Sequence, residues 1–140
     1  MTRKATAHWH GGLKDGRGDI STASGVLSGT AYSFHTRFEQ GQGTNPEELI
    51  AAAHAGCFSM ALSAQLGQEG LTPEEIATTA EVVMENLDSG WTVTESRLTV
   101  RATIPGADPA KFEAAAVRAK QGCPISKLLN AKISMDAQLK

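Results

Sequence analysis

The sequence predicts a single α+β domain spanning residues 1–140, and three observations support this prediction. The chain of 140 residues has the size of one ordinary domain. Segments rich in alternating or β-branched residues predict strands, and a long apolar segment behind a helix-start motif predicts a central helix. The resulting order, β…β-α-ββ-α-α-β, is typical of α+β domains. With 41% hydrophobic and 20% charged residues, the domain can bury a core without metals or disulfides.

The first third of the chain predicts a meandering antiparallel sheet. The predicted strands lie at residues 5–9, 19–22 and 32–38. An Asp-Gly dipeptide at residues 15–16 is typical of a hairpin turn, and further glycines separate the segments. If the third segment is a strand, Arg37 shares its face with His35 and Glu39.

The clearest predicted element is a long helix that starts at Pro46 and stops near Gly67. Asn45 is the predicted N-cap, Pro46 suits the first helical position, and Glu48 stands at the capping-box position. The middle of this helix is apolar nearly all round, apart from His54. Such a helix is buried on all sides, and a domain this small offers little cover, so we expect a partner subunit.

The second half of the chain predicts a hairpin, two helices and a closing strand. The hairpin covers residues 76–103, with strands at 81–85 and 91–103 around a turn at 86–90. An amphipathic helix is predicted at residues 110–121 with Gly122 as its C-cap. Cys123 and Pro124 then open a short helix that ends at Leu129, and residues 133–139 form the closing strand.

Charge and hydropathy exclude several classes of partner. The net charge is −2 and no Lys/Arg block occurs, which argues against nucleic acid or an anionic membrane as the main partner. No apolar run approaches the ~20 residues that a membrane helix needs. The N-terminus lacks the apolar stretch of a signal peptide, so the expected compartment is the cytosol. Disulfides in cytosolic proteins are often catalytic or redox-sensing, which makes the two cysteines candidates for chemistry.

The two cysteines differ in their local setting. Cys57 lies mid-way along the predicted buried helix, where the helix dipole gives little help and burial raises the pKa of a thiol. It is therefore reactive only if another part of the fold supplies a cation. Cys123 is the predicted N-cap of the last short helix, where free backbone N–H groups can stabilise a thiolate. Two unrelated packing thiols are the alternative, and their spacing excludes a C-x-x-C motif.

Three further residues are candidates for the same site, each with a structural alternative. Arg37 can pair with a thiolate or belong to a solvated strand face. Glu47 can serve the site or simply favour the first turn of its helix through the dipole. His54 can act as a general base or as a hydrogen-bonded histidine of the core or an interface.

Several motifs together resemble the OsmC/Ohr family of osmotically inducible and organic hydroperoxide resistance peroxidases. The motifs are TNPEEL at residues 44–49, AAAHAGCFSMAL at 51–62 and AKQGCPISKLL at 119–129. The N-terminal motifs resemble the osmotically inducible branch, and they are AHWH at 7–10, STASGVL at 21–27 and FHTRFE at 34–39. The resemblance covers essentially the whole chain, and the two cysteine motifs are specific in combination.

The resemblance implies an antioxidant thiol peroxidase of the stress response. Cys57 would be the peroxidatic cysteine that becomes a sulfenic acid, and Cys123 would resolve it to a disulfide. Arg37 would pair with the Cys57 thiolate, and Glu47 would hold that arginine. The implied fold is OsmC-like, with antiparallel sheets wrapped around a central buried helix in an intertwined homodimer. No metal or flavin is implied, and an external dithiol or dihydrolipoyl protein would be the reductant.

Helix geometry adds an expectation about which subunit supplies each residue. Glu47 and Cys57 are ten residues apart on one predicted helix, which separates them by roughly 15 Å along its axis. A glutamate cannot span that distance. We therefore expect composite sites in which the other subunit supplies Glu47.

Other classes of function remain alternatives at this stage. One is a non-enzymatic, stress-related dimer that binds a small apolar ligand between its helices. Another is a hydrolase with a Cys57–His54 dyad, for which no oxyanion hole is visible. Metal binding through these two residues and Cys123 offers too few ligands for a closed structural zinc site. The apolar surroundings of the predicted site favour an alkyl hydroperoxide as substrate.

Overall fold

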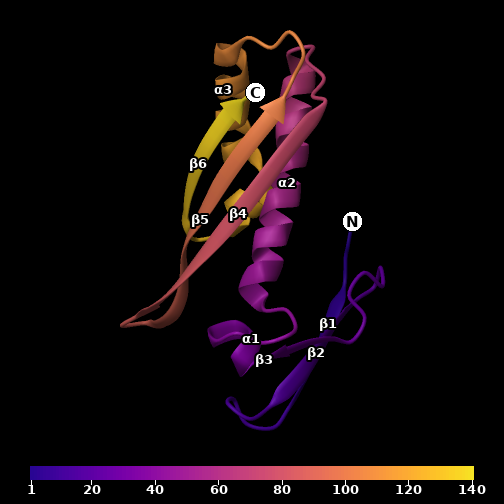
Figure 1. Cartoon of the computed structure of the whole chain (residues 1–140), viewed down its shortest axis with the longest axis vertical. Helices are drawn as coiled ribbons and strands as arrows, with labels where there is room; N and C mark the ends of the chain where they lie inside the picture. Colours follow the sequence, from indigo (N-terminus) through magenta and orange to yellow (C-terminus); the bar gives the residue numbers. More distant parts are fainter. The chain divides into compact units, whose positions relative to one another are not determined.

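The computed structural model describes all 140 residues and contains six strands and four helices. It divides into two compact units, residues 1–49 and 50–140, each of which is described by itself (Figure 1). Helix α2 (Pro46–Gln68) continues through the boundary between them. The single domain expected for residues 1–140 stays a prediction.

The first unit contains a small antiparallel sheet, as predicted. Its strands, in spatial order, are β1 (Ala5–His10), β2 (Arg17–Thr22) and β3 (Thr30–Ser33). His10 pairs with Arg17 at the end of the first hairpin. Gly11 turns the chain there with a φ of 91°, a left-handed conformation that glycine adopts without a steric penalty.

Residues 34–38 form a short helix, α1 (Phe34–Phe38), which corrects the strand predicted at 32–38. The Ser33 hydroxyl accepts a hydrogen bond from the Thr36 N–H at 3.2 Å, and the Ser33 N–H donates to the Thr36 hydroxyl at 2.8 Å. This reciprocal capping box offers the backbone an alternative to a strand ladder. The shared strand face expected for Arg37 is therefore wrong, because that residue is helical.

Helix α2 begins where the sequence predicts and ends close to the predicted stop. The Asn45 side chain accepts the Glu48 N–H at 2.8 Å, and Pro46 is the first helical residue. At the other end, the Leu66 carbonyl accepts a hydrogen bond from the residue after Gly70, which has a φ of 72°. A left-handed glycine of this kind is a usual way to terminate a helix.

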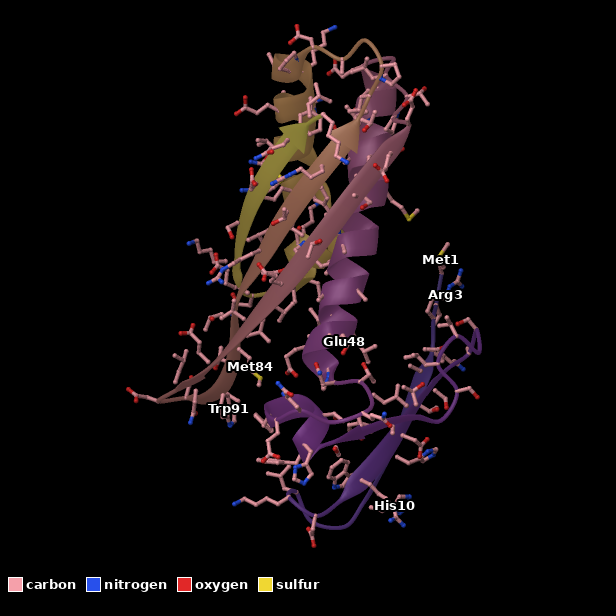
Figure 2. All side chains as sticks on the ribbon, viewed as in Figure 1. Met1, Arg3, His10, Glu48, Met84 and Trp91 are labelled. Atoms are coloured by element: carbon pink, nitrogen blue, oxygen red, sulfur yellow. The ribbon has the colours of Figure 1, made fainter.

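The second unit contains a three-stranded sheet. Its strands, in spatial order, are β4 (Glu75–Leu87), β5 (Gly90–Thr103) and β6 (Lys132–Leu139). β4 and β5 form the predicted antiparallel hairpin, with Leu87 opposite Gly90 across a tight turn. Met84 and Trp91, labelled in Figure 2, mark this end of the hairpin.

The pairing of β6 with β5 is parallel, so the second sheet is mixed rather than wholly antiparallel. Parallel neighbours need a long crossover connection. Helices α3 (Pro109–Gly122) and α4 (Pro124–Leu128) supply it between the two strands. The α+β fold class is confirmed, with this one pairing as a correction.

Helix α3 has a well-formed start, and its end places a cysteine at a helix junction. The Asp108 carboxylate accepts the Ala110 N–H at 2.7 Å, and Pro109 is the first helical residue. Gly122, the predicted C-cap, is instead the last helical residue. Cys123 is both the C-cap of α3 and the N-cap of α4.

The hydrophobic core lies in the second unit, where α2 and α3 cover one face of the sheet (Figure 1). β5 alternates, so that every second side chain points into this core and the intervening ones point out. Three elements, α2, β5 and α3, supply most of the core. Their fully or almost fully buried hydrophobic side chains are Phe58, Leu62, Leu66, Leu98, Val100, Ala102, Phe112, Ala115, Ala116 and Ala119.

Within one chain, α2 buries a single stripe rather than its whole circumference. The stripe recurs every four residues and consists of His54, Phe58, Leu62 and Leu66. On the opposite face, Met60 is 77% exposed. By length and mean hydropathy alone α2 could cross a membrane, so the expectation that no apolar run is that long is wrong. Core helices of soluble proteins pass the same test. Burial on all sides stays a prediction.

Candidate active site

Cys57 lies on α2 among small residues, beside the buried stripe of that helix. It is half-buried and packs against the hydrophobic core. Small neighbours such as Ala61 let other elements approach the helix closely at this level. The sequence therefore makes this turn of α2 a place where a second element can reach the thiol.

Cys123 reaches Cys57 from the junction of α3 and α4. Its side chain is buried, and its Sγ lies 3.1 Å from the Sγ of Cys57. Both thiols are free. Two sulfur atoms this close need to move only about 1 Å to form a disulfide bond, whose length is about 2.05 Å. The structure thus brings together the two cysteines that the sequence singled out.

The surroundings act differently on the two thiols. Burial raises the pKa of Cys57, the hydrogen bond with Cys123 raises it further, and the Ile125 backbone N–H partly opposes both effects. Burial also raises the pKa of Cys123, but the nearby Ser126 backbone N–H, the contact with Cys57 and the Ser126 hydroxyl outweigh this effect. The net effect lowers the pKa of Cys123.

The opposite pKa shifts of the two thiols agree with the prediction that the N-terminus of α4 stabilises a Cys123 thiolate. The Cys123 sulfur makes no conventional capping hydrogen bond, yet the free N–H groups of the first turn still stabilise its thiolate electrostatically. Within the second unit, Cys123 is the more acidic thiol. Cys57 gains only the partial support of the Ile125 N–H there, and its pKa stays raised, which agrees with the expectation that it needs a cation from elsewhere.

Arg37 and Glu47 form a close ion pair within the first unit. Arg37 lies in the last turn of α1, and Glu47 lies in the first turn of α2. Nε of Arg37 donates to both carboxylate oxygens at 3.2 Å, and Nη2 donates to Oε1 at 2.8 Å. A bidentate pair of this kind orients the planar guanidinium as well as neutralising it. The Glu47 side chain is only 14% exposed.

The four predicted site residues therefore form two pairs, each inside one unit. Arg37 pairs with Glu47, and Cys57 pairs with Cys123. Because α2 is one uninterrupted helix, Glu47 and Cys57 are separated by roughly 15 Å along its axis. Helix α2 therefore holds Glu47 away from Cys57 of the same chain. That the other subunit supplies Glu47 stays a prediction.

An apolar pocket of about 290 Å³ lies in the first unit beside Arg37. Its aromatic lining is held by ring contacts, with centroids 5.3 Å apart for Trp9–Tyr32 and 4.7 Å apart for Phe34–Phe38. The remaining lining residues are Leu13, Ser33 and Pro46. The pocket combines apolar walls with one cationic group.

His54 is completely buried, and both of its ring nitrogens have hydroxyl partners. Nδ1 lies 2.7 Å from the Ser96 Oγ of β5, and Nε2 lies 2.8 Å from the Ser126 Oγ of α4. Neither nitrogen is left to activate Cys57, which removes the Cys57–His54 hydrolase dyad considered from the sequence. The two serines were missed. Two signals in the sequence could have indicated them. Ser96 occupies an inward-facing position of the alternating strand β5, and Ser126 stands three residues after Cys123, within one turn of the helix that Cys123 begins.

A family model described as OsmC-like protein matches residues 39–138, which is most of the chain. The chain belongs to the OsmC family. The resemblance seen in the cysteine motifs is thereby confirmed, and the α+β fold is that of the OsmC family.

Individual relatives agree with membership of the OsmC family. Peroxiredoxin OsmC of Escherichia coli is 51% identical over 138 residues, covering 99% of this chain and 96% of that protein. The Organic hydroperoxide resistance protein of Xanthomonas axonopodis pv. citri is 32% identical over 100 residues, covering 71% of this chain and 68% of that protein. Among solved structures, OhrB of Bacillus subtilis has a TM-score of 0.71 at 26% identity, covering 100% of this chain and 98% of its own.

These relationships settle the class of chemistry for this OsmC-family chain. It is a peroxiredoxin-type enzyme, a peroxidase that works through thiols. The chain contains no cluster of three or more candidate metal ligands. The paired cysteines of the second unit are the only thiols available for that chemistry.

Proposed function

We propose that this protein reduces organic hydroperoxides with Cys57 as the attacking thiol and Cys123 as the resolving thiol. The observation that carries the proposal is the 3.1 Å approach of the two free thiols in a chain of the OsmC family. The printed names of the relatives, Peroxiredoxin OsmC and Organic hydroperoxide resistance protein, support a peroxide substrate of this class.

The proposed cycle has three steps that balance. The Cys57 thiolate attacks the terminal oxygen of the hydroperoxide, the O–O bond breaks, and the alkoxide leaves as an alcohol after taking up a proton. The resulting Cys57 sulfenic acid is then attacked by the Cys123 sulfur, so that a disulfide forms and water leaves. An external dithiol reduces the disulfide by thiol–disulfide exchange. A dihydrolipoyl protein suits that role, and the cycle uses no metal or flavin.

Arg37 supplies the cation that Cys57 needs in this proposal. Burial raises the pKa of Cys57, whereas the thiolate is the reactive form. A guanidinium beside the sulfur stabilises the thiolate and polarises the peroxide oxygen. Glu47 holds Arg37 through its bidentate contact, so that the guanidinium is presented in one orientation.

The apolar pocket beside Arg37 supports an alkyl rather than a bare peroxide as the preferred substrate. Its aromatic walls favour a hydrocarbon group, because apolar surface removed from water contributes about 25 cal/mol per Å². Arg37 is one of the lining residues, so its guanidinium can meet the polar end of such a molecule. Hydrogen peroxide can still react, but it gains nothing from the walls.

A homodimer is supported by the apolar surface that a single chain leaves uncovered. No hydrophobic side chain of residues 1–49 is among the buried core, and Met60 on α2 is 77% exposed. A small three-stranded sheet without a core of its own is not independently stable. A second copy of the chain can cover both surfaces, in the intertwined arrangement that the family resemblance implies.

The active site of this proposed dimer is composite. Arg37 and Glu47 belong to the same chain because they form one ion pair. Helix geometry keeps Glu47 roughly 15 Å from Cys57 of its own chain. The Arg37–Glu47 pair of one subunit therefore serves the Cys57–Cys123 pair of the other. The dithiol-dependent cycle suits the reducing cytoplasm.

The decisive experiment is thiol titration with mass spectrometry after one equivalent of cumene hydroperoxide. We expect two thiols to disappear and a peptide linking Cys57 to Cys123 to form. Cumyl alcohol is the matched control, because it offers the same hydrocarbon without an O–O bond and should change nothing. If the peroxide is added and both thiols remain free, the proposal is wrong.

A further inference from the structure

A buried polar chain leads from β5 to the resolving thiol and is not used by the reaction cycle described above. His54 and Ser96 are both completely buried and lie 2.7 Å apart from Nδ1 to Oγ. On the other side of the ring, Nε2 lies 2.8 Å from the Ser126 hydroxyl. A fully buried imidazole with two hydroxyl partners is an unusual feature in an otherwise apolar core.

The series of buried polar groups continues from Ser126 towards the two sulfur atoms. Ser126 stands three residues after Cys123, in the first turn of α4, and its backbone N–H and hydroxyl both lower the pKa of the Cys123 thiol. That sulfur lies 3.1 Å from the Sγ of Cys57. These groups form a path in which hydrogen bonds join Ser96, His54 and Ser126, and the path ends beside the Cys123 sulfur of the thiol pair.

The chemistry of these groups allows a proton to move along the path. A hydroxyl both donates and accepts, and a neutral imidazole donates from one nitrogen and accepts at the other. If Nδ1–H of His54 donates to Ser96, Nε2 is the acceptor that faces Ser126. Burial lowers the pKa of His54, so its resting form is the neutral imidazole.

The other titratable groups around His54 do not compete for this role. On α2, Cys57 stands three residues after His54, and at the α4 junction Cys123 stands three residues before Ser126, so both thiols belong to the path itself. Lys127, the charged residue of α4, is exposed. The charged side chains of β5 that flank Ser96 are Glu95 and Arg97, which alternate to the opposite face of the sheet and pair with each other. On β6, Lys132 also pairs with Glu95.

We propose that Ser126 and His54 form a proton relay for Cys123, in which Ser96 fixes the orientation of the imidazole. The inference rests on the proposed function, because it concerns the step in which Cys123 attacks the Cys57 sulfenic acid. His54 acts through Ser126 and is a positioning residue in this scheme, not a group that touches the substrate.

The relay step balances as follows. The Cys123 thiol gives its proton to Ser126 Oγ while Ser126 gives its own hydroxyl proton to His54 Nε2. The Cys123 sulfur then bonds to the Cys57 sulfur, and the S–O bond of the sulfenic acid breaks. The departing hydroxide takes the proton back from His54 through Ser126 and leaves as water. The Cys123 sulfur is oxidised and the Cys57 sulfur is reduced, so no further redox partner is needed.

The relay is tested by timing the two chemical steps separately in the full-length protein. After mixing with one equivalent of cumene hydroperoxide, samples are quenched with dimedone and analysed by mass spectrometry for Cys57 sulfenic acid and for disulfide. In Ser126→Ala we expect disulfide closure at neutral pH to slow by roughly 10²-fold, the low end of what proton transfer contributes. Formation of the sulfenic acid should keep its wild-type rate.

The pH profile separates a relay from a merely structural role. In Ser126→Ala and His54→Gln, closure should recover towards the wild-type rate at high pH, where Cys123 ionises without help. Ser126→Thr keeps a hydroxyl and should restore closure at neutral pH. Ser59→Ala is the matched control, because Ser59 also lies on α2 and also bonds a strand hydroxyl, that of Thr78 at 2.8 Å, but is outside the path.

Three outcomes would overturn the relay. Wild-type closure rates in Ser126→Ala at all pH values show that no proton passes through this hydroxyl. Equal slowing of sulfenic acid formation and closure, without recovery at high pH, assigns the serine a structural role only. Failure of Ser126→Thr to restore closure contradicts transfer through a hydroxyl. If the wild-type protein forms no sulfenic acid with peroxide, the proposed function itself fails, which is a distinguishable result.

Discussion

The Sγ atoms of Cys57 and Cys123 lie 3.1 Å apart, although the two residues are 66 positions apart in the chain. One thiol is carried by a long central helix and the other by the junction of two later helices. The contact between the two thiols is therefore made by tertiary packing. Because the proposed cycle gives the two thiols different roles, replacing one should have a different effect from replacing the other.

Replacing the cysteines one at a time should separate attack from resolution. Cys57→Ser should abolish peroxide reduction, because no thiolate remains at the attacking position. Cys123→Ser should react once and accumulate Cys57 sulfenic acid, since no second thiol closes the disulfide. Dimedone labelling with mass spectrometry measures both. A Cys57→Ser protein that still consumes peroxide at the wild-type rate would contradict the assignment.

Replacing Arg37 with methionine should slow the reaction of Cys57 with peroxide by roughly 10²–10³-fold, the usual effect of removing one such electrostatic group. Because burial raises the pKa of Cys57, the loss of the cation should also move the pH profile of the rate to higher pH. Stopped-flow measurement of the peroxide reaction between pH 6 and 10 gives both values. Arg97→Met is the matched control, since Arg97 also pairs with a glutamate but belongs to the other unit. Its rate should not change.

Mixing two inactive variants should restore activity if the sites are composite. A dimer of Cys57→Ser with Glu47→Gln contains one site in which both residues are intact, provided that each site takes Glu47 from the other chain. Co-expression with two different tags and two purification steps yields this heterodimer. We expect half of the wild-type activity per dimer. No activity above that of the parent variants would mean that one chain supplies both residues.

The aromatic pocket predicts a preference for alkyl hydroperoxides. Phe34→Ala should weaken the reaction with cumene hydroperoxide by roughly 10- to 100-fold in kcat/KM, because a buried phenyl ring contributes about 1.5–3 kcal/mol. The reaction with hydrogen peroxide should be unaffected. Trp91→Ala removes an aromatic ring outside the pocket and serves as control. A wild-type protein that clearly prefers hydrogen peroxide would refute the proposed role of the pocket.

The buried His54 predicts a loss of stability in mild acid. Burial lowers the pKa of His54 in the folded protein, so below its ordinary pKa of about 6.5 the unfolded chain binds the extra proton. The free energy of unfolding should therefore be highest above that pH and fall as the pH decreases through the window down to the folded pKa. Urea unfolding from about pH 7.5 to about pH 5.5 measures this slope.

A pair of histidine variants isolates the contribution of His54. His54→Gln should unfold with a flatter dependence on pH, whereas His10→Gln, which replaces an exposed histidine of β1, should keep the wild-type slope. Equal slopes in the wild type and in His54→Gln would show that this histidine is not responsible.

The start of α2 and the β4–β5 hairpin could be predicted from sequence because their signals are local. Asn45 and Pro46 act within one turn of the residues that they cap, and a hairpin pairs neighbouring segments. The strand predicted at 32–38 failed for an equally local reason. The capping box between Ser33 and Thr36 competes with strand pairing, and its Ser-x-x-Thr pattern was present in the sequence.

The sequence alone determined the element types except at residues 34–38, the candidate residues Arg37, Glu47, Cys57 and Cys123, and the need for a cation beside Cys57. Those conclusions depend on periodicity, capping and motif chemistry, which act between near neighbours or rest on a resemblance. Only the tertiary structure decided which groups meet. The contact of the thiols and the burial of His54 between two serines depend on how α2, β5 and α4 pack, and that packing arises from the whole core rather than from any short segment.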